Sequence, residues 1–186
     1  MARVWYVSYG SNMHLDRFTR YLDLCREPTP PVATRPLTVP GGVYFATESP
    51  VWGGGRAFYD PDLPRTAAAR AYLITERQFA DVVAQEMYRA PDRDLDLRTA
   101  LATGRHALGP GRYETLLHLG DHAGHPALTF TAPWSAADVE HTAPTAAYLQ
   151  TLKAGLHAAH GWNADQTAAY LAACTPFWTV TDLRDL

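Results

Sequence analysis

The sequence predicts an α+β protein in which several short strands are interrupted by helices. Three observations lead to this prediction. The chain has 186 residues, of which 47% are hydrophobic and 19% charged, enough for a single domain over residues 1–186 with a sizeable core. Short runs rich in β-branched and aromatic residues, bounded by Gly and Pro, indicate strands. Between them, apolar residues that recur every three or four positions indicate helices.

The first strand is the most informative stretch of the chain. Residues 4–7 (VWYV) are apolar and aromatic, and they end abruptly in a small polar loop at residues 8–12 (SYGSN). A helical pattern then runs from Met13 to about Leu24. A strand, a turn with a glycine and a helix start in direct succession point backbone N–H groups at one spot, which suits an anion or a developing oxyanion. The same pattern is as typical of a tight turn without a ligand.

The next part of the chain is irregular before it becomes regular again. Residues 27–42 are rich in Pro, Thr and Gly, which predicts a long surface crossing that borders the site. The glycines that follow Trp52 exclude a central strand or helix at residues 48–55. This stretch is either a mobile connection or a place where backbone passes close to a ligand or another strand. Three further strands are predicted at residues 43–47, 56–60 and 67–74.

The clearest helix is predicted over residues 76–88. Thr75 and Gln78 have the spacing of a capping box. Glu86 falls on the apolar stripe of this helix, which is formed by Phe79, Val82, Val83 and Met87. Burying an unpaired carboxylate is costly, so Glu86 is a candidate acid or base in a reaction. It can equally be half of a structural pair with an arginine, or an edge of the stripe that reaches solvent.

The second half of the chain predicts a hairpin and helices. A charged stretch at residues 92–98 leads into a short helix near 96–103. Strands are expected at 112–119, 127–131 and 176–180, and helices at 145–160 and 164–174. His122 and His125 lie in the hairpin turn. They are far more typical of a turn than of a metal site, although a metal-dependent hydrolase is the alternative that they would support.

Composition excludes several classes of protein. The net charge is −3 and the 16 Lys and Arg residues are scattered, so no nucleic-acid partner is expected. No run of about 18 apolar residues is present, nor a signal-peptide pattern, so we expect a cytoplasmic protein with no membrane partner. Cys25 and Cys174 are expected as free thiols. The chain has no GxSxG, P-loop, GxGxxG, CxxC or HExxH motif, so we expect no metal and no cofactor.

Three motifs in the chain resemble those of the γ-glutamylcyclotransferase family. They are YGSN after an N-terminal strand, a Trp-Gly-Gly stretch at Trp52 to Gly54 followed by Ala57, and the Gln-Glu pair of Gln85 and Glu86 on a helix that follows a strand. They occur in the order of that family and at similar separations, and the similarity extends over roughly residues 4–148. The resemblance implies a small mixed or antiparallel barrel-like core with helices packed outside it, and a site at one mouth of the barrel.

The resemblance also implies roles for individual residues. Glu86 would be the general acid/base. The substrate would be bound by Tyr9, Gly10, Ser11, Asn12, Trp52, Gly54, Tyr113 and Tyr148. The chain departs from the family where Phe130 replaces the tyrosine of some members, where Val82 and Val83 replace a common Leu-Asp, and where Met87 replaces a frequent glycine.

The implied activity is cofactor-independent and belongs to glutathione-related metabolism. A γ-glutamyl amide or peptide would be cyclised to 5-oxoproline with release of an amine or an amino acid, so the expected partner is a small molecule with a γ-glutamyl-like head. Intramolecular attack profits from an effective molarity on the order of 10⁵ M. The alternative is a catalytically silent member of the same fold that binds a small molecule or a partner.

Overall fold

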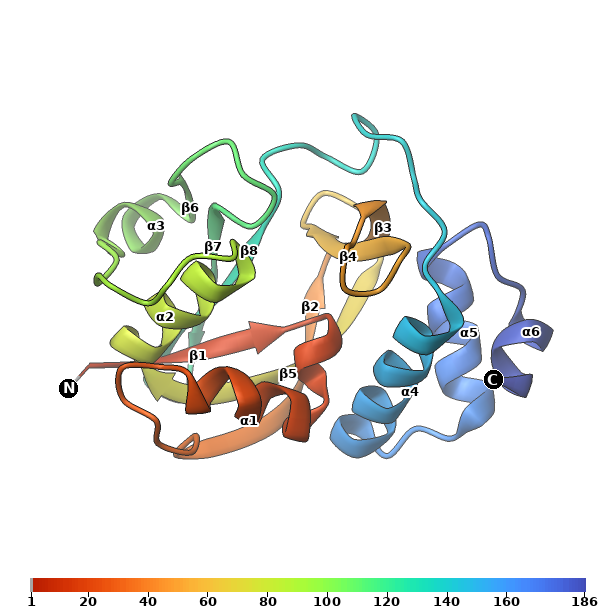
Figure 1. The fold of residues 1–186 in the computed structure, drawn as a ribbon, viewed down its shortest axis with the longest axis horizontal. Helices are drawn as coiled ribbons and strands as arrows, with labels where there is room; N and C mark the ends of the chain where they lie inside the picture. The colour runs from red at the N-terminus through yellow and green to blue at the C-terminus, as the bar shows by residue number, and fades with distance from the viewer. Residues whose placement is uncertain (1) are drawn as a thin grey trace. The chain divides into compact units, whose positions relative to one another are not determined.

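The computed structural model describes residues 2–186, which form two compact units interleaved along the chain. The first unit comprises residues 2–8, 16–37 and 70–133, and the second comprises residues 9–15, 38–69 and 134–186. Figure 1 labels the helices and strands of both units. The expectation of one domain over the whole chain stays a prediction, and each unit is described by itself.

A six-stranded mixed sheet belongs mainly to the first unit. The strand order is β2-β5-β1-β8-β7-β6, and β1 is antiparallel to β5 but parallel to β8. The strands are β1 (Arg3–Ser8), β2 (Ala33–Pro40), β5 (Thr66–Thr75), β6 (Arg105–Ala107), β7 (Thr115–His122) and β8 (His125–Thr131). β1 is buried from Val4 to Ser8, as a strand covered on both faces should be. A mixed sheet with surrounding helices confirms the predicted α+β class; the barrel-like closure stays a prediction.

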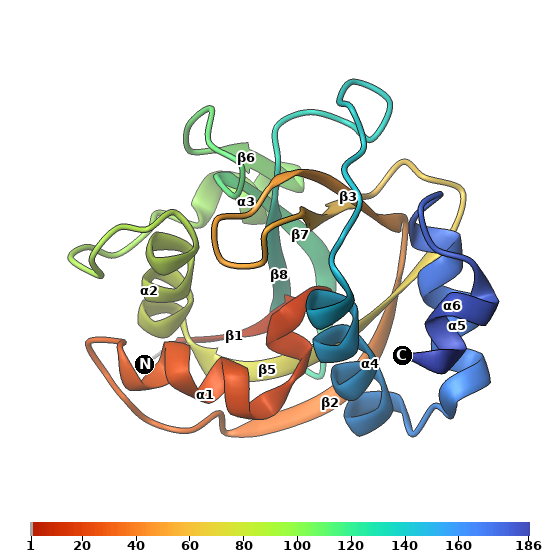
Figure 2. The same ribbon diagram turned by 45° about the vertical axis from the view of Figure 1, so that its right-hand side comes forward.

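Three helices complete the first unit, namely α1 (Leu15–Asp23), α2 (Glu76–Glu86) and α3 (Arg98–Thr103). Both α1 and α2 lie beside β1 (Figures 1 and 2). Aromatic side chains of the helices and of the sheet pack around Tyr6. The centroid of its ring lies 5.4 Å from that of Phe130, on which it stacks, and 5.3 Å from that of Phe18. The predicted capping box is present, because Gln78 N donates to Thr75 Oγ1 and Thr75 N donates to Gln78 Oε1.

The second unit combines a hairpin with helices. β3 (Gly42–Glu48) and β4 (Gly55–Asp60) form an antiparallel pair, and the helices are the 3₁₀ helix η1 (Ser11–Met13), α4 (Ala146–His160), α5 (Ala164–Cys174) and α6 (Val180–Asp185). The helix α4 packs closely on η1, because a methyl group at Gly155 would come within 2.8 Å of Met13 Cβ. A glycine is therefore required where the two helices meet.

Several predicted boundaries were wrong. Residues 33–40 form an edge strand where a surface crossing was expected, and Pro36 and Pro40 are tolerated there because an edge strand has one unpaired side. The strand predicted at 176–180 is replaced by α6, which Thr179 caps. The strand predicted from residue 112 begins at Thr115, and α2 ends at Glu86 rather than at residue 88.

The two cysteines are buried free thiols, as expected. Burial raises the pKa of Cys25 to about 12 and that of Cys174 to about 11. Both therefore stay protonated at neutral pH, and neither has the character of a reactive thiolate. Within residues 2–186, no helix is both long enough and apolar enough to cross a membrane.

Candidate functional site

The loop at residues 9–12 belongs to the second unit. It follows β1 directly, and Met13 N donates to Gly10 O at 3.0 Å to close the first turn of η1. Gly10 has φ −113° and ψ −150°, an extended conformation, and a methyl group there would make an ordinary contact of 3.5 Å with Tyr148 Oη. The turn therefore does not use the conformational freedom of glycine. Tyr9 and Asn12 are buried, and the ring centroids of Tyr9 and Tyr59 are 5.7 Å apart.

Tyr148, near the start of α4, contacts several of the predicted substrate residues within the second unit. Trp52 stacks on its ring with a centroid distance of 4.9 Å and an angle of 25° between the planes. Its hydroxyl oxygen accepts a hydrogen bond of 3.3 Å from Ala57 N and lies beside Gly10. The structure thus brings together Gly10, Trp52 and Tyr148, which are widely separated in sequence.

The glycine-rich stretch makes a close approach to another backbone segment. A methyl group at Gly54 would come within 2.7 Å of Ala143 O, and Gly55 N donates to that oxygen at 2.8 Å. Thr145 Oγ1 donates to Trp52 O at 3.1 Å. Of the two alternatives for this stretch, the close approach of backbone is the one found. A role of Gly54 in binding substrate stays a prediction.

Glu86, the candidate acid/base, belongs to the first unit, where it is the last residue of α2 and is half-buried. The hydroxyl of Tyr21 hydrogen-bonds to its side chain and also to that of Arg17. Burial, followed by the negative charge of Glu86, raises the pKa of Tyr21 above its ordinary value. The phenol therefore stays protonated at neutral pH and donates to the carboxylate. Arg112 Nη2 donates to the backbone oxygen of Glu86 at 2.8 Å.

The most deeply buried acid of α2 is Asp81, which the sequence analysis missed. Its side chain is 0% exposed, and it pairs with Arg26 through an Nη2–Oδ1 distance of 2.7 Å. Arg26 N also donates to Asp81 Oδ2 at 2.8 Å. The signal in the sequence is a polar stripe opposite the apolar one, because Gln78, Asp81 and Gln85 recur at helical spacing. A structural ion pair thus exists on this helix, at Asp81.

Tyr113 was predicted to line the substrate pocket from a strand, and it lies instead in the turn before β7. Its ring is buried and meets Phe130 edge to face at 5.9 Å. Phe130 in turn stacks on Tyr6, so both rings belong to the aromatic core of the first unit. Contact of Tyr113 with a substrate stays a prediction.

The hairpin histidines flank a two-residue turn between β7 and β8. Ala123 and Gly124 have φ values of +48° and +79°, as a type I′ turn requires, and His122 pairs with His125 across it. His122 Nε2 lies 2.8 Å from Arg35 Nη1, so the imidazole nitrogen accepts from the guanidinium. Within residues 2–186, no three His, Cys, Asp or Glu side chains are grouped to hold a metal.

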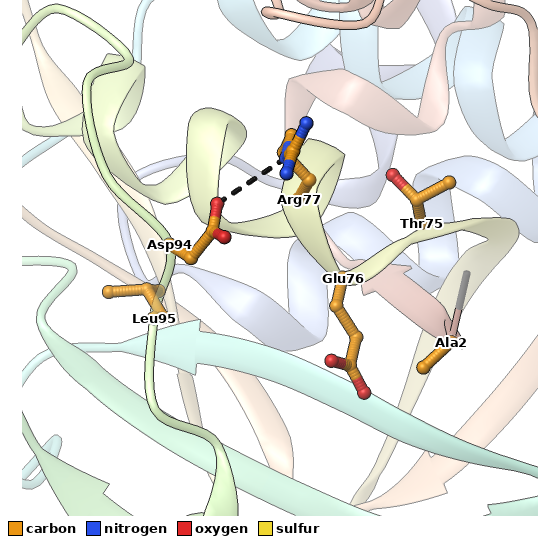
Figure 3. Close-up of a pocket in the computed structure, with 6 residues that line it drawn as sticks. All are labelled: Ala2, Thr75, Glu76, Arg77, Asp94 and Leu95. Carbon is orange, nitrogen blue, oxygen red and sulfur yellow. Dashed lines mark ion pairs between the residues drawn. The ribbon is translucent and has the colours of Figure 1, made fainter.

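A small cavity of about 150 Å³ lies at the start of α2 (Figure 3). Arg77 Nε and Asp94 Oδ1 are 3.5 Å apart at its side, and Glu76 and Leu95 also line it. Its volume is below the 300 Å³ or so at which ligand pockets begin. None of the predicted site residues lines this cavity.

The fold is γ-glutamylcyclotransferase-like. The chain superimposes on a solved structure named gamma-glutamyl cyclotransferase with a TM-score of 0.53 and 13% identity, over 98% of each chain. It superimposes on a human protein named only as uncharacterized with a TM-score of 0.60 and 13% identity, over the full length of both. At these identities the likeness concerns the fold alone.

Comparisons of sequence gave a different result. No family model matches the chain. Histone deacetylase 5 of Arabidopsis thaliana is 31% identical over 198 residues, which cover 90% of this chain and 30% of the plant protein. The chain therefore spans less than a third of the length of this relative.

Proposed function

We propose that the protein is a γ-glutamylcyclotransferase-type enzyme that converts a small γ-glutamyl amide or peptide to 5-oxoproline. The observation that carries the proposal is the environment of Glu86, a half-buried carboxylate that a protonated phenol holds in place. Such a carboxylate keeps access to solvent or substrate and can exchange a proton. The fold and the grouping of Gly10, Trp52 and Tyr148 within the second unit support the same conclusion.

The reaction would need the protein to remove a proton, to stabilise an oxyanion and to return a proton. Glu86 would take a proton from the α-ammonium group of the substrate, so that the amine attacks the γ-carbonyl carbon and closes the five-membered ring. Backbone amides in the loop at residues 9–12 would stabilise the oxyanion or hold the α-carboxylate. Glu86 would return the proton to the leaving nitrogen as the bond between carbon and nitrogen breaks. The products are 5-oxoproline and a free amine or amino acid.

The test is to incubate the purified chain with γ-glutamyl dipeptides and γ-glutamylamines and to measure 5-oxoproline by mass spectrometry. The proposal expects product from at least one member of the panel and much less from the Glu86→Gln variant. Absence of product across the panel would overturn it.

The second candidate is a catalytically silent member that binds a small molecule or a partner. The replacements Val82, Val83 and Met87 next to the candidate acid favour it. Binding of a γ-glutamyl compound without any turnover, measured by calorimetry and by mass spectrometry on the same sample, would identify this case.

A further inference from the structure

A cavity of about 620 Å³ lies in the first unit, between α2 and the residues that follow it. Its apolar lining includes Val83 and Ala84 of α2 together with Leu95 and Leu108. The lining also includes Ala80, Ala90 and the charged residues Arg89, Asp92, Arg93 and Glu114. Apolar walls with a few charged groups, at a volume between about 300 and 1,000 Å³, are typical of sites for small molecules. Glu86 does not line it.

The end of α2 shapes this cavity by reversing the chain. Arg89 N donates to Ala84 O at 2.9 Å and Tyr88 N donates to Gln85 O at 2.9 Å, the two bonds of a Schellman motif. Tyr88 takes the left-handed position of this motif with φ +57°, where glycine is usual. The reversal returns the chain to the last turn of α2 and places Arg89 at the cavity.

Glu114 is the buried charge of the cavity. Its side chain is 7% exposed, and Gly111 N donates to its Oε2 at 2.8 Å. The loop packs on this carboxylate so closely that a methyl group at Gly109 would come within 2.5 Å of Oε2. The backbone thus fixes Oε2, while Oε1 is 2.5 Å from Arg89 Nη2.

The two partners of this ion pair differ in how firmly they are held. A buried carboxylate requires a cation, because leaving its charge unpaired costs several kcal/mol. Arg89, the cation present, has a side chain that is 61% exposed. Arg93 is bound to its own neighbour Asp92 at 3.1 Å. Arg89 can therefore move toward solvent at little cost, provided that another cation takes its place at Glu114.

We propose that this cavity binds an α-amino acid with an apolar side chain. The ammonium group of the ligand replaces Arg89 at Glu114, and the released Arg89 pairs with the carboxylate of the ligand. One ion pair is exchanged for two, and no charge is left buried without a partner. The apolar side chain of the ligand lies against the wall formed by Val83, Ala84, Leu95 and Leu108. This inference does not depend on the proposed function.

A ligand with only one charge fits this exchange less well. A simple amine would displace Arg89 at Glu114 but has no carboxylate with which to form the second ion pair. A simple carboxylate would compete with Glu114 for the same arginine, and two negative charges would then lie side by side. The zwitterion is the form that satisfies both groups at once.

The test is calorimetric titration of the whole chain with L-leucine, 4-methylpentanoate and 3-methylbutylamine, which share the branched apolar end. We expect saturable binding of leucine and binding at least about tenfold weaker for the two singly charged compounds, a difference of about 1.4 kcal/mol. Equal binding of all three would overturn the exchange of ion pairs. If neither L-leucine nor L-methionine bound, the proposal of an amino-acid site would be overturned.

Variants of residues inside and outside the cavity test whether leucine binds there. Ala84→Leu fills the cavity without touching a charge, and Glu114→Gln keeps the shape of the acid, so each should weaken leucine binding at least about tenfold. The matched controls are Ala102→Leu and Arg98→Gln on α3, both outside the cavity, and Glu86→Gln, which should leave binding unchanged. Circular dichroism on each variant shows whether it is folded. Leucine binding that Glu86→Gln abolishes and that folded Ala84→Leu retains would overturn the proposal and place the ligand elsewhere.

Discussion

The middle and the end of α2 each carry an acid, and the two acids are held in different ways. Asp81 is fully buried and forms an ion pair with Arg26. Glu86 is half-buried at the last residue of the helix, where the hydroxyl of Tyr21 hydrogen-bonds to its side chain and to that of Arg17. A fully buried carboxylate needs its cation for stability, whereas a half-buried carboxylate at the helix end stays accessible to solvent. Burial of an acid alone is therefore a poor guide to catalysis.

The largest expected effect is on turnover in Glu86→Gln. The amide keeps the shape of the side chain but cannot accept the proton, so kcat should fall by a factor of about 10² to 10⁴. The melting temperature should change little, because Glu86 is half-exposed. Both quantities are measured on one preparation. Normal turnover with a clearly lower melting temperature would assign Glu86 a structural role like that of Asp81.

Asp81→Asn should show the opposite pattern. It removes the charge that pairs with Arg26, and the free energy of unfolding should fall by about 2 kcal/mol, less than the roughly 3–5 kcal/mol typical of a buried pair because Arg26 is partly exposed. That corresponds to a decrease of about 4 to 8 °C in Tm for a chain of this size. Thermal unfolding followed by circular dichroism measures it. Unchanged stability, or lost activity in fully folded protein, would contradict the assignment of a structural role to Asp81 and a catalytic role to Glu86.

Tyr21→Phe tests how the carboxylate of Glu86 is held. A hydrogen bond to a charged group contributes about 1.5 kcal/mol, so kcat should fall about tenfold while the variant stays folded. Arg20→Gln, an exposed change on the same helix α1, is the control and should retain full turnover. If Tyr21→Phe turned over at the normal rate, the phenol would be a packing group only.

The smallest effect concerns stability at high pH. Burial raises the pKa of Tyr21 above its ordinary value of 10.0, so above pH 10 the folded chain holds a proton that the unfolded chain releases. Stability should therefore fall as pH rises through 10. In Tyr21→Phe this fall should be less steep, by up to about 1.4 kcal/mol per pH unit. Urea unfolding at pH 9 and pH 10.5 gives both slopes, and equal slopes would contradict the prediction.

Local features of the sequence predicted the elements on which these acids lie. The pair Thr75 and Gln78 marked the start of α2, and the apolar run at residues 4–7 marked β1, because caps and periodicity depend on residues that are close in the chain. The edge strand β2 was missed, since its two prolines are also typical of a loop and only pairing with β5 makes it a strand.

The surroundings of each acid were decided by the tertiary structure. The sequence by itself determined that Glu86 shares a helical face with Phe79 and Val82, and that this helix begins after Thr75. It did not determine that Asp81 would meet Arg26, 55 positions away, or that Glu114 would meet Arg89. Burial and ion pairing depend on which distant segment covers a side chain, and a short-range pattern contains no information about that segment.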